Sequence, residues 1–432
     1  ILAQASGGGS SRLQHTPASG SLRPPCSLRI PQAQAMSSRL CDRNASRRAL
    51  STSTSWMRPM LGLMAFAVEL PSMVRCCSYF EIEYPAKRSS GTGYAIGRTM
   101  ELANVLGHTT YNIELVPRNA SGGSLGYVAP MNILELPPTY MKLPFEGMNE
   151  EGFTASAQYF QESVYEAPDD GVESLSSAFV VQRLLEKCGT VEEALAYLAS
   201  VRVVGGDPIQ GGPGLHWALT DPSGRSVVVE YLRGQRVVHE NTPRVMTNDP
   251  NLEWHWRNLN TYTNLNPSWP NRNDFMSVEI DGVGRVPRPV GHGWNLYGLP
   301  GDLSPPSRFV RLFYLRGYAM HAAPPRNISE SVVLGTALLN HIMIPFGTVA
   351  FDPTDKTDNP EYTPYGVLKF PKDKYMLIRG YRSTQWRMID FTRVDFSKAQ
   401  KWPLEDGSMG IQDITDTGNP SAPTADVFQS VI

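Results

Sequence analysis

The five cysteines of this 432-residue sequence are its most distinctive candidates for chemistry, because a thiolate can act as a nucleophile or bind a metal. They are Cys26, Cys41, Cys76, Cys77 and Cys188. Their odd number fits no disulfide framework. Neither a Cys-x-x-Cys nor a His-x-x-x-His pair occurs, so the spacing of a zinc site is missing and we expect no structural metal. The adjacent pair Cys76 and Cys77 is the unusual feature that remains.

Other motifs with possible chemistry are weaker. Residues 122–126 match the G-x-S-x-G elbow of serine hydrolases, with Ser124 at its centre, but Pro130 opposes the helix that must follow the serine. We therefore interpret this segment as a glycine loop. Residues 91–93 have glycines typical of a phosphate loop but lead into a predicted strand, so they indicate a hairpin turn. His216 and His255 lie among apolar residues and are expected to be structural, hydrogen-bonded histidines.

Cys77 differs from the other cysteines because a series of motifs follows it in order along the chain. Cys77-Ser78 opens a predicted strand, and Gly97-Arg98-Thr99-Met100-Glu101 follows. The further blocks are Val116-Pro117-Arg118, Gly147-Met148-Asn149-Glu150-Glu151-Gly152, Leu215-His216-Trp217 with the hairpin of residues 221–230, Met246-Thr247-Asn248-Asp249-Pro250, Asn258-Leu259-Asn260-Thr261-Tyr262, and Gly298-Leu299-Pro300-Gly301-Asp302 with Ser307-Arg308-Phe309. This series resembles the choloylglycine hydrolase family of bile salt hydrolases and penicillin V acylases, which belongs to the N-terminal nucleophile hydrolases. The resemblance covers residues 77–391.

The resemblance implies that Cys77 is the first residue of the mature chain, with its thiol as nucleophile and its own α-amine as base. An α-amine has a pKa of about 7.7 to 8, so it can take up and return a proton near neutral pH. An internal Cys77 has an amide nitrogen and cannot act in this way. Family precursors commonly cleave themselves at this bond, and we expect the same here. Cys76 is the rival nucleophile, but the small hydroxyl residue that follows the family cysteine favours Cys77-Ser78.

The resemblance also assigns the groups around the nucleophile. The oxyanion donors would be the side chain of Asn248 and the backbone amide of Tyr159, each worth about 2.7 to 4 kcal/mol in acyl transfer. Arg98 and Arg308 match arginines that can lower the thiol pKa and hold the carbonyl side of the substrate. Glu101 stands where the family usually has Asp, so we expect its carboxylate to orient the α-amine from one methylene farther away. Tyr at position 159 is common in penicillin V acylases, whereas bile salt hydrolases usually have Asn.

The elements that must position these residues are predicted from periodicity and turn residues. Strands are expected at 78–82, 94–98, 111–116, 153–159, 215–220, 226–232, 365–370, 375–379 and 386–391, and helices at 177–187, 190–199, 307–320 and 329–342. Thr190 and Glu193 form a capping box. Strands, then helices, then strands, without regular alternation, indicate a layered α+β fold. With the resemblance, this predicts the four-layer α-ββ-α sandwich of N-terminal nucleophile hydrolases.

Composition divides the chain into three parts. We expect residues 1–76 to be a largely disordered leader that is removed, residues 77–402 to be the hydrolase domain, and residues 403–432 to be a disordered tail. The leader is rich in Ser and Arg, its first methionine is Met36, and the apolar run 60–68 follows. This pattern fits a signal peptide and an organellar transit peptide equally, so it favours a secreted or organellar protein. A disordered segment without an address is the remaining alternative.

Charge and hydrophobicity limit the partners. The run 60–68 is far shorter than the roughly 20 apolar residues of a membrane helix, so we expect no membrane span. Residues 1–60 hold eight Arg, no Lys and one acidic residue, Asp42, so the overall charge of -2 leaves the rest of the chain clearly acidic and a poor binder of nucleic acid. The expected partner is a small-molecule N-acyl amide, with no metal or organic cofactor. A homo-oligomer stays open.

The sequence therefore predicts a hydrolase of linear C–N amide bonds of the N-acyl amide, conjugated bile salt or penicillin V type. The acyl group stays open among bile salts, phenoxyacetyl amides, N-acyl homoserine lactones and fatty-acyl amides, because the loops expected to form its pocket, within 129–145 and 263–290, differ from both familiar subgroups. The alternative from another class is a non-catalytic binding protein of the same fold that is never cleaved. A serine esterase using Ser124 is a third hypothesis.

Overall fold

Two antiparallel β-sheets lie at the centre of the protein. The computed structural model describes residues 77–101, 110–119, 121–136, 139–205, 214–268, 277–287, 293–349, 360–405 and 410. In these ranges the first sheet has six strands, in the order β13 (Val245–Met246), β1 (Cys77–Pro85), β2 (Thr92–Met100), β16 (Tyr365–Phe370), β17 (Tyr375–Gly380) and β18 (Arg387–Asp390). Its register places Cys77 opposite Met100, which is opposite Tyr365 on its other side. The start of β1 therefore lies beside the end of β2.

The second sheet carries most of the strands that follow β2. As far as the structure describes it, it has nine strands, in the order β12 (Gln235–Glu240), β11 (Ser226–Leu232), β10 (Leu215–Thr220), β7 (Thr154–Tyr159), β6 (Glu146–Asn149), β4 (Tyr127–Leu136), β3 (Thr110–Val116) and β19 (Gln400–Pro403), with β5 (Thr139–Pro144) paired to β4. Two smaller pairs are β14 (Ser277–Ile280) with β15 (Gly284–Pro287) and β8 (Ser174–Ser176) with β9 (Arg202–Val204).

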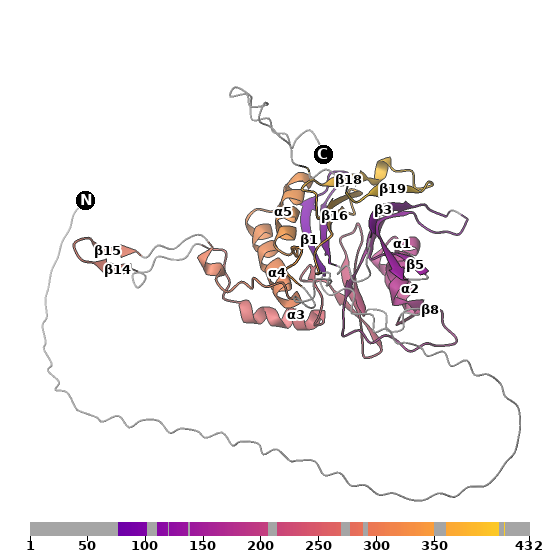
Figure 1. Ribbon diagram of the computed structural model, residues 1–432, viewed down its shortest axis with the longest axis horizontal. Coiled ribbons are helices and arrows are strands. Elements are labelled where there is room, and N and C mark those ends of the chain that lie inside the picture. The colour runs from indigo at the N-terminus through magenta and orange to yellow at the C-terminus, as the bar shows by residue number, and fades with distance from the viewer. Residues whose placement is uncertain are drawn as a thin grey trace, which may run out of the picture. The chain divides into compact units, whose positions relative to one another are not determined.

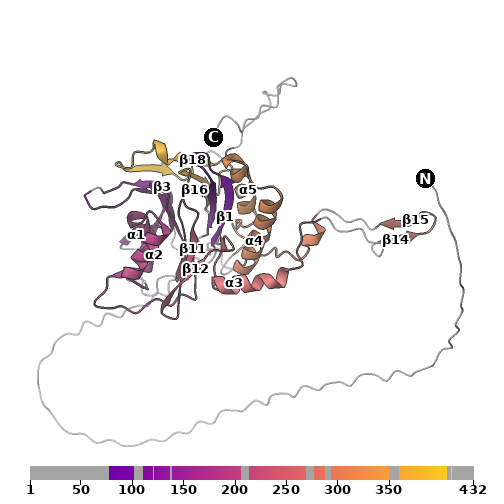
Figure 2. The same ribbon diagram turned by 180° about the vertical axis from the view of Figure 1, so that it is seen from behind.

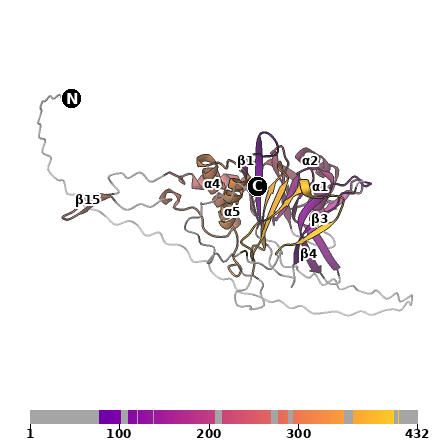
Figure 3. The same cartoon turned by 90° about the horizontal axis from the view of Figure 1, so that it is seen from above.

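Helices cover the outer face of each sheet (Figures 1, 2 and 3). The helices are α1 (Val180–Lys187), α2 (Val191–Ser200), α3 (Leu252–Asn258), α4 (Pro305–Ala322) and α5 (Ile328–Asn340), with short 3-10 turns at Ser177–Phe179, Leu259–Tyr262, Trp294–Leu296 and Phe391–Arg393. α4 and α5 pack on β1, α1 packs on β6 and β7, and β1 lies against β7 between the sheets. This order of helices, sheet, sheet and helices is the four-layer α-ββ-α sandwich that the sequence predicts.

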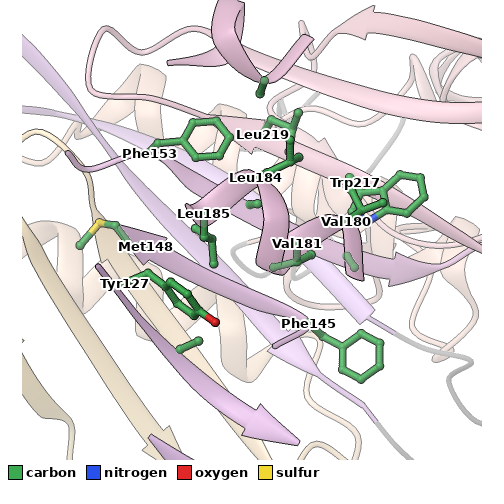
Figure 4. Packing of buried hydrophobic residues seen from close by; sticks show 14 of the residues in the cluster. Tyr127, Phe145, Met148, Phe153, Val180, Val181, Leu184, Leu185, Trp217 and Leu219 are labelled. Atoms are coloured by element: carbon green, nitrogen blue, oxygen red, sulfur yellow. The ribbon is translucent and has the colours of Figure 1, made fainter. Parts of the chain in front are cut away.

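Side-chain burial explains why the layers pack in this way. Every residue of β7, β10 and β16 is buried, as expected for strands covered on both faces. On the second sheet, Leu185 of α1 lies near Tyr127 and Met148, and Leu184 lies near Leu219, all in one buried cluster (Figure 4). A Cβ on Gly147 would lie 2.7 Å from Cδ1 of Leu185, so only glycine allows α1 to approach β6 this closely.

The predicted elements are confirmed, with small shifts at their ends. All the expected strands and helices are present, and β1 and β2 form a hairpin whose turn contains Gly91 with φ of 89°. Thr190 caps α2 by accepting a 3.1 Å hydrogen bond from the backbone nitrogen of Glu193. Ser124 forms a bridge with Asn119 in a turn that leads into a strand, so the interpretation of this segment as a glycine loop is confirmed.

Residues 129–145, which we expected to be a loop, lie mainly in strands β4 and β5. Pro130 is paired with Ile113 of β3, on one side of β4 only. On the other side, β6 pairs with Tyr127 and Val128 and β5 begins to pair at Met131, so Pro130 lies between two partners. At Pro130 the strand therefore has a register partner on one side only, as an edge strand has, and such positions tolerate proline.

The boundaries of the predicted domain lie close to the limits of the ordered elements. β1 begins at Cys77, and β19 reaches Pro403, one residue past the boundary that we placed after residue 402. Leu404 is also buried. Residues 1–76 and 411–432, for which we expected a leader and a tail, lie outside the described residues. No helix among the described residues is both long enough and apolar enough to cross a membrane.

Candidate active site

Cys77 lies at the start of β1 with its whole side chain buried. Its sulfur is 3.6 Å from Nη2 of Arg98. Its backbone nitrogen donates a 2.8 Å hydrogen bond to Oδ1 of Asn248, and its carbonyl oxygen accepts a 2.7 Å bond from Nη1 of Arg308. The thiol, nitrogen and carbonyl of one residue are thus each held by a different side chain.

The thiol of Cys77 is protonated at neutral pH in this uncleaved chain. Burial raises its pKa to about 11, because the interior disfavours the thiolate. Arg98 and Arg308 oppose this rise, as does the backbone amide of Glu101, whereas the Glu101 carboxylate adds to it. The two cations are therefore insufficient to activate the thiol, and a base is needed to remove its proton.

Arg98 is the cation nearest to the thiol, and its guanidinium is fixed by several acceptors. It lies on β2, which pairs with the strand of Cys77 in the β1–β2 hairpin, and its side chain is completely buried. Nη1 donates to Oε1 of Glu146 at 3.0 Å, and Nη2 donates to the carbonyl oxygen of Ala157 at 2.9 Å. Burial opposes its charge, but Glu146 and the Cys77 thiol outweigh burial and hold the pKa of Arg98 above its usual value. Arg98 is consequently a permanent positive charge beside the sulfur.

Asn248 links Cys77 to Tyr159, the residue of the other expected oxyanion donor. Its Nδ2 donates a 2.8 Å hydrogen bond to the carbonyl oxygen of Tyr159, the last residue of β7. Its Oδ1 accepts bonds from the Cys77 nitrogen and, at 2.8 Å, from Nη2 of Arg308. A side-chain amide has two N–H groups, and the Tyr159 carbonyl accepts only one of them. Arg308 also binds Ser78, so it fixes the first two residues of β1 together.

Glu101 lies directly after β2, beside the start of β1, but its carboxylate is bound by hydroxyl groups. Oε1 accepts a 2.6 Å hydrogen bond from Thr363, and Oε2 accepts a 3.0 Å bond from Thr99. Burial raises the pKa of Glu101 to about 7, against the lowering effects of Arg308, Thr363 and Thr99. In this uncleaved chain the Cys77 nitrogen is bonded to Asn248, and the contact between Glu101 and an α-amine stays a prediction.

His216 and His255 support the backbone of the Asn248 segment. Nε2 of His216 lies 2.9 Å from the carbonyl oxygen of Thr247, and Nε2 of His255 lies 2.9 Å from that of Asn248. Nδ1 of His216 is 3.1 Å from Oε1 of Glu230. Burial lowers the pKa of His255 to about 4, so its ring is neutral. Both histidines are structural and hydrogen-bonded, as the sequence predicts.

The structure brings all six predicted site residues together at the start of β1. They come from β1, the end of β2, β7, the segment after β13, and α4. Sequence reasoning missed two residues. Glu146 is the acidic residue that binds Arg98, and Lys369 is the second partner of Glu146, with its Nζ 3.2 Å from Oε2. The only local signal is a charged residue inside an otherwise apolar strand. Among the described residues, no group of His, Cys, Asp or Glu side chains could hold a metal ion.

This arrangement places a buried thiol, a fixed cation and a side-chain amide around one point, which are groups that acyl transfer can use. A family model described as linear amide C–N hydrolases, choloylglycine hydrolase family, matches residues 97–397. The match includes five of the six predicted site residues and begins after Cys77.

Known proteins with similar sequences and folds agree with this match. The bile salt hydrolase/transferase of Clostridium perfringens (strain 13 / Type A) is 29% identical over 255 residues, which cover 57% of this chain and 72% of that protein. A crystal structure of a variant of the conjugated bile acid hydrolase from Clostridium perfringens has a TM-score of 0.60 at 21% identity, covering 76% of this chain and 96% of that one. The penicillin V acylase of Agrobacterium tumefaciens has a TM-score of 0.50 at 22% identity, covering 76% and 92%. The fold is that of the N-terminal nucleophile hydrolases, and the chain belongs to the choloylglycine hydrolase family of enzymes that hydrolyse linear amide C–N bonds.

Proposed function

We propose that Cys77 is the nucleophile of this amide hydrolase and becomes the first residue of the mature chain when residues 1–76 are removed. The observation that supports this most is the convergence of Arg98, Asn248 and Arg308 on the thiol, nitrogen and carbonyl of one buried cysteine. Backbone nitrogen and carbonyl groups need partners wherever they are buried, but a cysteine that served only to fill the core would not need a buried arginine beside its sulfur.

The proposed reaction begins when the α-amine of Cys77 takes the thiol proton and the sulfur attacks the carbonyl carbon of the substrate amide. A C–S bond forms, and the carbonyl oxygen takes up the negative charge, with the free N–H of Asn248 and the backbone amide of Tyr159 as donors. The amine then gives its proton to the leaving nitrogen, and the C–N bond breaks. A water molecule, deprotonated by the same amine, releases the acid and restores the thiol.

Removal of the leader would convert a latent site into an active one. In the uncleaved chain the Cys77 nitrogen is an amide, which cannot act as a base, and the thiol has a pKa of about 11. Cleavage of the bond between residues 76 and 77 supplies an amine next to the thiol. We infer that the chain makes this cleavage itself: the same thiol attacks the carbonyl carbon of Cys76, the peptide C–N bond breaks as the Cys77 nitrogen takes up the thiol proton, and water hydrolyses the resulting thioester.

We infer an N-acyl amide as the small-molecule substrate, since the relatives are named for conjugated bile acids and penicillin V. Tyr159 favours the penicillin V type slightly. A panel of glycocholate, penicillin V, an N-acyl homoserine lactone and a fatty-acyl amide, compared by kcat/KM, would rank these classes.

Intact mass and two cysteine variants test the proposal. We expect the purified active protein to begin at Cys77, and Cys77→Ala to lose amide hydrolysis while Cys188→Ala, which changes a second buried free cysteine, keeps it. An active enzyme that begins at another residue, or an active Cys77→Ala variant, would contradict the proposal. A protein that keeps residues 1–76 and releases no amine would instead support the alternative of an uncleaved binding protein.

A further inference from the structure

Three charged side chains form a completely buried cluster beneath the thiol of Cys77. Arg98 of β2, Glu146 of β6 and Lys369 of β16 have no exposed surface. Nη1 of Arg98 and Nζ of Lys369 bind different oxygens of Glu146, at 3.0 and 3.2 Å. Lys369 also donates a 2.8 Å hydrogen bond to Oγ of Ser156. The cluster therefore joins the two sheets and contains two cations and one anion.

Stability alone does not account for this cluster. Moving a charged group from water into the interior costs several kcal/mol, and replacing buried ion pairs with apolar residues is often neutral or stabilising. Burial lowers the pKa of Lys369, and the Glu146 carboxylate opposes this fall. Arg98 is the member that reaches the reacting sulfur, at 3.6 Å.

We propose that Glu146 and Lys369 are positioning residues that hold the guanidinium of Arg98 beneath the Cys77 thiol and set the net charge there. This rests on the proposed role of Cys77 as nucleophile. Glu146 fixes one guanidinium nitrogen, but as a lone partner it would also cancel the charge of Arg98. Lys369 takes the second carboxylate oxygen, and the cluster keeps one net positive charge.

That single positive charge stabilises the thiolate that attacks the substrate. The other charged groups that act on the sulfur are the carboxylate of Glu101, which opposes the thiolate, and Arg308. Arg308 favours the thiolate and the ionised form of Glu101 opposes it, so these two groups act in opposite directions and the positive charge of the cluster adds to the balance at the sulfur. A loss of either sign within the cluster should change the thiol pKa, and a loss of both should leave it nearly unchanged.

The test compares Lys369→Met, Glu146→Gln and the double variant, each purified as the full chain with its N-terminus determined by intact mass. The readouts are the rate of Cys77 alkylation by iodoacetamide as a function of pH, followed on the Cys77 peptide by mass spectrometry, and kcat/KM for amide release. Lys369→Met should raise the thiol pKa by about one unit, which slows alkylation about tenfold below that pKa. Glu146→Gln should lower the thiol pKa yet also lower kcat, because Arg98 loses its anchor. The double variant should return the pKa toward the parent value.

A matched control separates this role from a structural one. Glu81→Gln removes another completely buried carboxylate, which pairs with Arg244 and lies on the same strand as Cys77. It should lower the melting temperature without changing the thiol pKa. Ser156→Ala removes the hydroxyl acceptor of Lys369 and is a milder second variant if Lys369→Met does not fold. Without this acceptor the charged form of Lys369 is less favoured, so the thiol pKa should rise in the same direction by a smaller amount.

Single variants that leave the thiol pKa unchanged, or pKa shifts that do not cancel in the double variant, would overturn the proposal. This failure is distinct from failure of the proposed function. If Cys77 is not the nucleophile, Cys77→Ala keeps its activity whatever the thiol pKa is. If only the charge cluster lacks the proposed role, Cys77→Ala is inactive while Lys369→Met and Glu146→Gln titrate like the parent.

Discussion

Replacing Asn248 with alanine separates its catalytic role from its structural role. Removing one oxyanion donor lowers kcat by about 10²- to 10³-fold in known acyl-transfer enzymes, or about 2.7 to 4 kcal/mol. An oxyanion donor acts mainly in the transition state, so we expect kcat to fall and KM to change little. Asn248→Ala also removes the 2.8 Å hydrogen bonds to the Tyr159 carbonyl oxygen and from the Cys77 nitrogen. Each buried hydrogen bond contributes about 0.5 to 1.5 kcal/mol, so stability should fall as well.

Asn149 provides a matched control for this loss of stability. It is also completely buried, and its Nδ2 donates to the carbonyl oxygens of Leu185 and Cys188 at 3.0 and 2.7 Å. Its Oδ1 accepts backbone hydrogen bonds, as that of Asn248 does. Asn149→Ala should therefore lose at least as much stability as Asn248→Ala while the folded protein keeps its kcat.

The assay must count only folded, processed enzyme. Intact mass gives the fraction that begins at Cys77, thermal unfolding gives the folded fraction at the assay temperature, and amine release from penicillin V or glycocholate gives kcat and KM. A kcat for Asn248→Ala within about fivefold of the parent, far below the expected loss, would show that Asn248 is not an oxyanion donor. An equal loss of kcat in Asn149→Ala would show that the effect is structural.

Three further changes test the surroundings of the nucleophile. Glu101→Gln should move the acidic limb of the kcat/KM profile to lower pH, because an amine without a nearby carboxylate has a lower pKa; an unchanged limb would mean that Glu101 does not contact the amine, and Glu101→Asp tests the spacing. Burial lowers the pKa of His255 to about 4, so between about pH 6.5 and 4 this histidine is protonated in the unfolded chain but not in the folded protein, and acidification destabilises the parent. His255→Gln should lack this contribution, as measured by thermal unfolding across that pH range. Ser124→Ala should keep full amide hydrolysis, and a serine-directed probe should label the variant and the parent alike. Loss of activity would support the esterase hypothesis.

Local sequence patterns were sufficient to predict most of the fold. Alternating or continuous apolar runs bounded by glycine and proline predicted β1, β7, β10 and β16. Side chains two residues apart lie on the same face of a strand, so such runs indicate a strand with one or both faces buried. Strands β4 and β5 were missed, since proline at position 130 argues against a strand unless the sheet has a gap beside it. That gap depends on where β5 and β6 pair, which no local pattern contains.

The candidate site was predicted in its members but not in its contacts. The order of the motifs pointed to Cys77, Asn248 and Arg308. Asn248 and Arg308 lie 171 and 231 residues after Cys77 in the sequence, and the three residues meet only in the folded protein. Glu146 and Lys369 were missed because a charged residue in a sequence is ordinarily interpreted as exposed. Their burial follows from the stacking of two sheets, which places β6 and β16 on opposite sides of one interface.

The state of the Cys77 thiol depends on the complete fold, not on its immediate neighbours in sequence. Ser78, which follows the cysteine in the motif, is buried and accepts a hydrogen bond from Arg308, a residue of α4 that lies 230 positions later in the sequence. Burial holds the thiol pKa near 11, and the groups that oppose this, Arg98 and Arg308, come from β2 and α4. An unfolded or partly folded chain lacks these cations and also lacks the burial, so its thiol would behave as an ordinary cysteine. Completion of both sheets and α4 is therefore what brings the Cys77 thiol and its partners into contact, and the geometry that the proposed amide hydrolysis needs exists only after the last of these elements has packed.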